Sequence, residues 1–192
     1  MNLLMIRHGE IPSNVNKVYA GRSPESLTRS GVLQAIQASE KLKGYKIDAL
    51  YSSPIQRALE TAQIIAEKVG VDLRVDGSFR ELEMGPWEGM SEDDVARLYP
   101  NEWSVWSHKP AELKLPGRET LDELLARVLA GIRNLYQDDP ANNTVIVTHV
   151  AIIRVLLLWH ERMSLNLYKT IHVPNAKVFE IVLDKLPLFN TP

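Results

Sequence analysis

The sequence predicts a three-layer α/β/α domain built on a mostly parallel central sheet. Short apolar runs alternate with segments of helical period along the whole chain, a pattern typical of parallel pairing. The first run, Leu3 to Ile6, is apolar without interruption, as expected for a strand buried on both faces. The chain has 192 residues, of which 45% are hydrophobic and 24% charged. We therefore expect one domain spanning residues 1–192.

Five of the apolar runs are expected to be strands: residues 3–6, 49–52, 73–75, 144–148 and 178–183. Helices are expected at 28–43, from 53 to 69, from 120 to 135 and at 150–160. Two of these helices begin with capping-box patterns, Ser53 with Gln56 and Thr120 with Glu123. The helix at 28–43 is expected to bury one side, made of Val32, Leu33, Ile36 and Leu42.

Residues 85–118 break this rhythm. The segment is rich in tryptophan and proline, and we expect it to be an inserted, partly helical cover. Its tryptophans are expected mainly to pack against the domain, with Trp103 and Trp106 as weak candidates for substrate contact.

Composition excludes several kinds of protein. The formal net charge is -2, which argues against a nucleic-acid partner because phosphate contacts need a basic surplus. There is no cysteine, so a disulfide framework, a thiolate nucleophile and a Cys–zinc site are excluded. The apolar start lacks the basic lead of a signal peptide. The later apolar stretch from Val150 is too short to span a membrane. We expect a cytoplasmic protein without a membrane partner, whose oligomeric state stays open.

Polar residues stand where expected strands end. The first strand leads into Arg7-His8, the central one into His149, the second into a helix that carries Arg57, and a short loop after the third carries Glu81. Because ligands bind at the carboxyl ends of parallel strands, we expect these side chains to converge on one rim.

That set suits phosphoryl chemistry. Guanidinium groups bind phosphoryl oxygens bidentately, and a neutral imidazole is a competent nucleophile near neutral pH. A carboxylic acid kept protonated by its surroundings can supply a proton to the departing alkoxide. This scheme requires no metal and no cofactor. His108, His160 and His172 have no comparable context and are expected to be structural.

The chain resembles the histidine phosphatase (phosphoglycerate-mutase-like) superfamily over nearly its whole length. The motifs that carry the resemblance are Arg7-His8-Gly9 with Asn14, Leu27-Thr28 with Gly31 and Gln34-Ala35, Ser53-Pro54-Ile55-Gln56-Arg57-Ala58-Leu59-Glu60-Thr61-Ala62, Glu81 with Gly85-Pro86-Trp87-Glu88-Gly89, and Val147-Thr148-His149. Five motifs in the same order along the chain are far more specific than the Arg7-His8-Gly9 triplet alone.

The resemblance implies a role for each site residue. His8 is the phosphorylated nucleophile, Glu81 the proton donor, and Arg7, Arg57 and His149 form the phosphate pocket. Substrate-lining positions are implied for Asn14, the backbone around Gly21, and Val150.

Two positions depart from the family pattern. Val150 replaces a common glycine and is expected to crowd the pocket wall, which would alter the substrate range. Arg118 also replaces a common glycine, and it either adds a positive charge near the substrate or is solvated. A third arginine, Arg154 on an apolar helix, is expected to pair with a buried carboxylate.

The resemblance favours a compact phosphomonoesterase acting on a small phosphorylated metabolite. The short tail after Leu183 and the single cover segment are more similar to the phosphatases of the family than to its mutases. Phosphoglycerate mutase is the first alternative. The second is a non-catalytic module on the same fold that binds a phosphorylated ligand or a protein.

Overall fold

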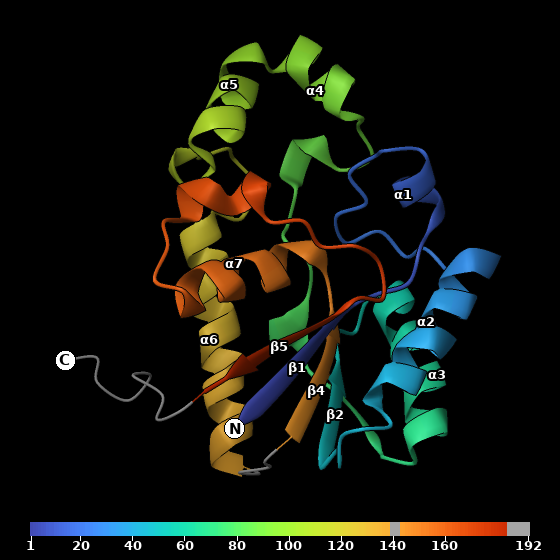
Figure 1. Ribbon diagram of the computed structural model, residues 1–192. Coiled ribbons are helices and arrows are strands. Elements are labelled where there is room, and N and C mark those ends of the chain that lie inside the picture. The colour runs from blue at the N-terminus through green and yellow to red at the C-terminus, as the bar shows by residue number, and fades with distance from the viewer. Residues whose placement is uncertain (139–142, 184–192) are drawn as a thin grey trace.

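Five strands form one mixed sheet in the order β3-β2-β4-β1-β5 in the computed structural model, which describes residues 1–138 and 143–183 (Figure 1). The strands are β1 (Asn2–Arg7), β2 (Ala49–Ser52), β3 (Leu73–Val75), β4 (Asn143–Thr148) and β5 (Val178–Val182). All pairs are parallel except β1 with β5. The mostly parallel sheet is therefore confirmed, while the tail beyond Leu183 lies outside the described residues.

The antiparallel strand β5 follows from where it begins. The backbone N–H of Ala176 donates to the carbonyl of Arg7, so the chain is already at the carboxyl end of β1 when β5 starts. No helix carries it back to the other end, so β5 can pair only by running in the opposite direction.

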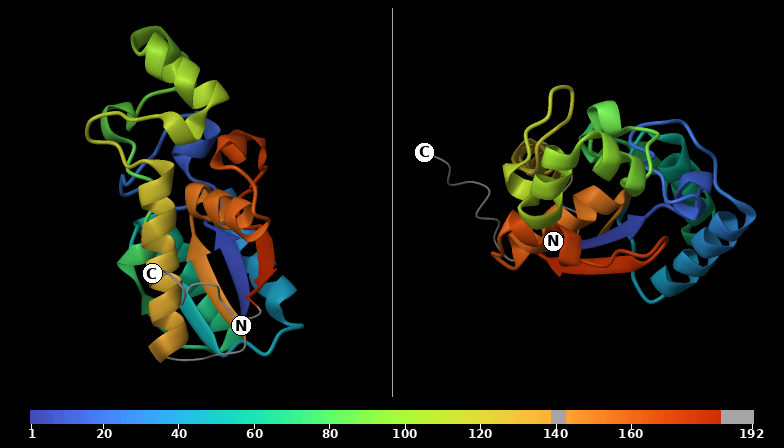
Figure 2. Two further views of the ribbon diagram at one scale, coloured as in Figure 1. Left: turned by 90° about the vertical axis from the view of Figure 1, so that its left-hand side faces the viewer. Right: turned by 90° about the horizontal axis from the view of Figure 1, so that it is seen from above.

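Two helices cover each face of the sheet (Figures 1 and 2). The helices α2 (Arg29–Leu42) and α3 (Gln56–Val69) lie on one face, and α6 (Leu121–Asp138) and α7 (Val150–His160) lie on the other. Alternate residues of β1 serve the two cores: Leu4 packs with the α2/α3 side, and Met5 packs with the α6/α7 side. Both are fully buried, which explains why the strand is apolar without interruption.

Two expectations about helices are wrong, and one is confirmed. Thr120 and Glu123 form the expected reciprocal capping box. Ser53 does not cap α3, because the helix begins only at Gln56 and the Ser53 hydroxyl bonds a histidine instead. Nor does α2 bury Val32 and Leu33. These are exposed, and the helix buries its small residues.

The buried residues of α2 are Gly31, Ala35, Ala38, Ser39 and Leu42. Small side chains let the helix approach its neighbours closely. A Cβ at Gly31 would lie only 2.3 Å from the carbonyl oxygen of Glu10.

The segment from 85 to 118 lies beyond the carboxyl end of the sheet, at the top of Figure 1. It contains η2 (Gly85–Trp87), α4 (Glu92–Leu98), α5 (Pro100–His108) and η3 (Pro110–Glu112). The remaining short elements are α1 (Pro12–Val15), η1 (Gly77–Phe79) and η4 (Leu165–Thr170). Among the described residues, no helix is long and apolar enough to cross a membrane.

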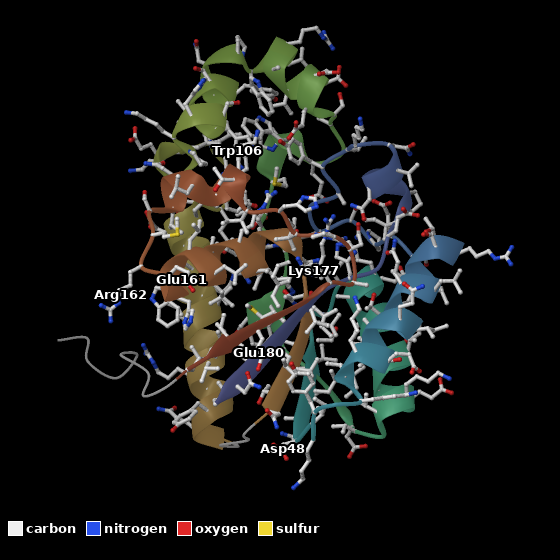
Figure 3. All side chains as sticks on the ribbon, in the orientation of Figure 1. Asp48, Trp106, Glu161, Arg162, Lys177 and Glu180 are labelled. Atoms are coloured by element: carbon white, nitrogen blue, oxygen red, sulfur yellow. The ribbon has the colours of Figure 1, made fainter. Side chains whose placement is uncertain are left out.

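Aromatic side chains of the cover pack against the domain. Trp106, labelled in Figure 3, belongs to the cover helix α5. Its ring centre is 5.1 Å from that of Tyr168 in η4 and 6.3 Å from that of Trp87, another residue of the cover. Arg118 is only 6% exposed, with its guanidinium carbon 4.2 Å from the centre of the Trp106 ring. The alternative in which Arg118 is solvated is therefore wrong, and Arg118 does not line the cavity described below either.

Candidate active site

A cavity of about 190 Å³ is lined by residues that follow β1 and β4 and by Glu92 and Trp106 of the cover helices. The predicted site residues that line it are Arg7, His8, Asn14, Gly21, Arg57, Glu81 and Val150. His149 does not line the cavity, but its ring centre lies 5.3 Å from that of His8. The structure thus brings together residues from four separate parts of the chain.

Strand order explains this convergence. The central strand β4 lies between β2 and β1, so His149 after β4 lies between Ser53 after β2 and His8 after β1. The register is fixed by backbone bonds from His8 N–H to Thr148 O and from Ser53 N–H to Val147 O. The side chains therefore meet because their strands end at one level.

The bonds of His8 define its tautomer. Nδ1 lies 2.7 Å from the carbonyl oxygen of Gly9, and a carbonyl only accepts, so Nδ1 carries the proton. Nε2 accepts a bond of 3.2 Å from Nε of Arg57. Burial, reinforced by Arg57 and Arg7, lowers the pKa of His8 well below its usual range. His8 is therefore a neutral imidazole with a lone pair on Nε2.

The two arginines of the site are held by carbonyl groups rather than by carboxylates. Arg57 donates to the carbonyl oxygens of Ser23 and Gly21 at 3.0 and 2.6 Å, and Arg7 donates to that of Val173 at 2.6 Å. Burial lowers the pKa of Arg7 to about 10, so it stays protonated near neutral pH. Carbonyl groups orient these cations without neutralising them, which leaves a positive site for an anion.

Gly21 has a backbone reason to be glycine. Its φ is 51°, and a Cβ there would lie 2.3 Å from a carboxylate oxygen of Glu88. Glycine adopts this left-handed turn, which places its carbonyl against Arg57, without the strain that a side chain would add.

Glu81 has the environment of a proton donor. It is 7% exposed, and its Oε1 accepts a bond of 2.7 Å from Leu82 N–H. Burial raises the pKa of Glu81 above its usual value, although Arg57 opposes the rise. The protonated carboxyl is thereby favoured inside the cavity.

The amide of Asn14 is oriented by two bonds. Its Oδ1 accepts from Ile11 N–H at 3.2 Å and from Nδ2 of Asn175 at 2.9 Å. The same Asn175 Nδ2 donates to the carbonyl of His8 at 3.0 Å. Because backbone N–H groups only donate and carbonyls only accept, the chemistry fixes both amides. Asn14 therefore keeps its Nδ2 free to donate in the cavity that it lines.

His149 follows β4 as the residue that precedes α7. Its Nε2 lies 2.7 Å from Oγ of Ser53, while its buried Nδ1 has no hydrogen-bond partner among the described residues. Burial lowers the pKa of His149 well below its usual range. Val150, the first residue of α7, lines the cavity wall as expected from its position.

The cavity is also lined by residues that the sequence did not single out as ligand contacts. They are Tyr19, Glu92, Arg154, Tyr168 and Lys169. Trp106 also lines the cavity, as one of two weak candidates, and Trp103 does not. The helical spacing of Val150 and Arg154, four residues apart on α7, is the signal that places Arg154 beside the site.

Arg154 corrects one expectation. It does not pair with a carboxylate among the described residues. Its Nε donates to the carbonyl of Ile171 at 2.9 Å, and its guanidinium carbon lies 4.9 Å from the centre of the Tyr168 ring. Within residues 1–138 and 143–183, no three His, Cys, Asp or Glu side chains are placed to hold a metal ion.

Comparison with known proteins agrees with this geometry. The family model of the histidine phosphatase superfamily (branch 1) matches residues 3–186. The chain is 31% identical to phosphoglycerate mutase-like protein 4 of Arabidopsis thaliana, over 92% of this chain and 76% of that protein. It is 28% identical to putative phosphoserine phosphatase 2 of Hydrogenobacter thermophilus, over 95% of this chain and 89% of that protein.

A solved structure shares the fold. YhfR of Bacillus stearothermophilus superposes with a TM-score of 0.89 at 24% identity, covering 96% of this chain and 92% of that one. Together with the family match across nearly the whole sequence, these likenesses confirm the resemblance drawn from the five motifs. The chain belongs to the histidine phosphatase superfamily.

Proposed function

We propose that this protein is a phosphomonoesterase that hydrolyses a small phosphorylated metabolite through a phosphohistidine intermediate on His8. The observation that carries the proposal is the state of that imidazole, which is neutral and keeps an unprotonated Nε2 beside two arginines. The cavity of about 190 Å³ is smaller than the about 300–1,000 Å³ of pockets for drug-sized ligands, which supports a small substrate.

In the first half of the reaction, Nε2 of His8 forms a bond to phosphorus while the bond from phosphorus to the alcohol oxygen breaks. Arg7, Arg57 and the free amide of Asn14 donate to the phosphoryl oxygens, and Arg57 Nε moves its bond from Nε2 to one of them. Protonated Glu81 gives its proton to the departing oxygen, so a neutral alcohol leaves.

In the second half, the Glu81 carboxylate takes a proton from water. The water oxygen bonds to phosphorus as the bond from Nε2 to phosphorus breaks, which releases inorganic phosphate and restores His8. This sequence uses no metal and no cofactor, so an excess of chelator is expected to leave turnover unchanged. Activity lost to the chelator and restored by a divalent metal would refute that part of the proposal.

The direct test is to trap the intermediate. The enzyme is mixed with an aryl phosphate, quenched without acid because phosphohistidine is acid-labile, and mapped by mass spectrometry. We expect the phosphoryl group on His8, and no turnover by His8→Ala. The matched control is His172→Asn, since His172 is exposed and outside the cavity. A phosphoryl group on another side chain, or none, would overturn the proposal.

The mutase alternative is favoured by the name of the Arabidopsis relative. A mutase returns the phosphoryl group to its product, whereas a phosphatase gives it to water. Incubation with 3-phosphoglycerate separates the two: we expect free phosphate, and isomerised product without free phosphate would show a mutase.

A further inference from the structure

We propose that Arg154 forms a second anion-binding position in the same cavity and that the substrate carries a carboxylate beside its phosphoryl group. This inference rests on the phosphomonoesterase function proposed above. Arg154, Arg7 and Arg57 all line one cavity, yet the phosphoryl chemistry uses only the last two.

The guanidinium of Arg154 lines the cavity and is only partly engaged by the protein. Its Nε is held by the carbonyl of Ile171, and one face lies against Tyr168. The Tyr168 hydroxyl is a hydrogen-bond partner of the Arg154 side chain, and no carboxylate among the described residues is paired with the guanidinium. A planar guanidinium fixed at Nε presents its other edge to a bidentate partner.

The nearby Lys169 is already engaged. Its Nζ lies 4.4 Å from the centre of the Trp103 ring and 3.8 Å from Glu92, which also accepts from the Tyr19 hydroxyl at 2.9 Å. Lys169 and Glu92 therefore largely offset each other. Unlike Lys169, Arg154 is not neutralised by a carboxylate among the described residues.

The backbone anchors of the two arginines lie close together, and the charge of Arg154 contributes to the lowered pKa of Arg7. Arg7 is anchored to the carbonyl of Val173 and Arg154 to that of Ile171. Carbonyls two residues apart are at most about 7 Å apart in an extended chain. A phosphorus and a carboxylate carbon joined through about three atoms, at about 1.5 Å per bond, span a comparable distance. A carboxylate also fits the small cavity better than a second phosphate does.

Substrate pairs that differ only in the second anion test this assignment. The first pair is 3-phosphoglycerate and glycerol 3-phosphate, in which a hydroxymethyl group replaces the carboxylate; the second is phosphoserine and phosphoethanolamine. We expect kcat/KM to favour the carboxylate of each pair by about 10- to 100-fold, the effect of one charge-assisted bidentate contact. Glycerol bisphosphate tests whether a second phosphate serves as well.

Variants then locate the effect. Arg154→Met should reduce the ratio of kcat/KM within each pair to near one, and Arg154→Lys should give an intermediate ratio because it keeps the charge without the planar fork. Arg97→Met is the control, since Arg97 is an exposed cation on α4 whose ion-pair partner among the described residues is Asp94. It should leave the ratio unchanged.

The failures are distinguishable. If the wild type hydrolyses neither member of a pair nor an aryl phosphate, the proposed function fails. If it hydrolyses both members equally, or if Arg154→Met and Arg154→Lys keep the full ratio, the second anion position is wrong while the phosphatase stands. A preference for the bisphosphate would overturn the carboxylate.

A separate observation supports a second inference: we infer that Asn175 is a positioning residue that aims Asn14 at the phosphoryl group. Asn175 uses both hydrogens of its amide, one on the carbonyl of His8 and one on Oδ1 of Asn14. It thereby joins the nucleophile's backbone to the donor beside it, and it sets which end of the Asn14 amide faces the cavity.

A double-mutant cycle separates positioning from general stability. Asn175→Ala should lower kcat/KM by about 10-fold in the wild type and by less than 2-fold when Asn14 is already alanine. Asn175→Ser is a second, smaller perturbation in case the alanine variant folds poorly. Equal losses in both backgrounds would overturn the inference.

The control is Asn2→Ala. Asn2 donates to Asn143 in another side-chain amide pair, at the opposite end of β1 from the site. It should leave kcat/KM unchanged, and a comparable loss there would also count against a specific role for Asn175.

Discussion

The hydroxyl of Ser53 meets Nε2 of His149 at 2.7 Å, across the gap between the ends of β2 and β4. The same oxygen accepts from Ile55 N–H at 3.2 Å, so its own proton is available to Nε2. A proton donated to Nε2 leaves Nδ1 of a neutral imidazole protonated. That Nδ1 is the buried donor without a partner, in a ring adjacent to His8, and a phosphoryl oxygen would satisfy it.

Ser53→Ala is therefore expected to lower kcat by about 5- to 20-fold, in line with the loss of one neutral hydrogen bond of about 1 kcal/mol and a freer ring. Steady-state kinetics measure the loss, and nitrogen NMR reports the tautomer. Ser39→Ala is the control, because Ser39 is a similarly buried residue whose hydroxyl donates to the carbonyl of Ile36 within α2. If both variants keep full kcat, Ser53 does not orient His149.

The proton of Glu81 is expected to matter in proportion to how poorly the alcohol leaves. Glu81→Gln keeps the shape but cannot donate a proton, so turnover of an alkyl phosphate should fall by about 10²- to 10⁴-fold. An aryl phosphate needs less help, so it should give a burst of one phenol per enzyme followed by slow release of phosphate. Stopped-flow measurement distinguishes the two phases.

Glu83→Gln is the control for that experiment. Glu83 is half exposed and pairs with Arg22 at 2.8 Å, two residues from Glu81 in sequence. Equal losses in the rate of the first, phosphorylation phase on alkyl and aryl substrates by Glu81→Gln would remove it from the role of acid.

The sequence predicts most of this site because its residues stand at strand ends. Once Arg7-His8 and Thr148-His149 are assigned to parallel strands, their meeting at one rim follows from topology alone.

What the sequence could not predict depends on side-chain competition. In sequence, Ser53 with Gln56 fits a capping box. In the structure the Ser53 hydroxyl bonds Nε2 of His149 instead, and the sequence does not show that these two residues are close. Asn175 carries no local pattern, because its two partners lie more than 160 residues away in sequence. The partner of Arg154 is a carbonyl 17 residues further along the chain rather than the expected carboxylate.

Arg118 gives a prediction about stability rather than catalysis. Its Nε and one terminal nitrogen are buried without partners among the described residues, and each such donor costs about 1–3 kcal/mol. Its stacking on Trp106 and Trp87 stabilises the folded protein by up to about 2 kcal/mol per ring. Arg118→Met keeps the length without the charge, so the free energy of unfolding should stay within about 1 kcal/mol of wild type or rise.

Arg118→Ala should instead lower the free energy of unfolding by about 2 kcal/mol or more, because it opens a cavity beneath Trp106. Urea denaturation compares the two variants. Should methionine cost as much as alanine, the charge itself would be the stabilising feature.

The pH dependence of stability tests the neutral histidines. The pKa values of His8 and His149 are depressed in the folded protein by burial and by neighbouring arginines, whereas unfolded histidine titrates near 6.5. As pH falls below about 6.5, these two histidines bind protons in the unfolded chain but not in the folded protein. The free energy of unfolding should then fall by about 1.4 kcal/mol per pH unit for each histidine, until the folded pKa is reached. Glu81, whose pKa is raised, acts oppositely, because its contribution is present at low pH and is lost as pH rises through the folded pKa.

Urea unfolding at a series of pH values from 7 down to 5 tests this. The free energy of unfolding should change less steeply with pH in His8→Asn and in His149→Asn than in the wild type. His172→Asn is the exposed control. Slopes equal to wild type in both variants would mean that these imidazoles accept protons in the folded state, and Nε2 of His8 would then lack the lone pair on which the proposed chemistry depends.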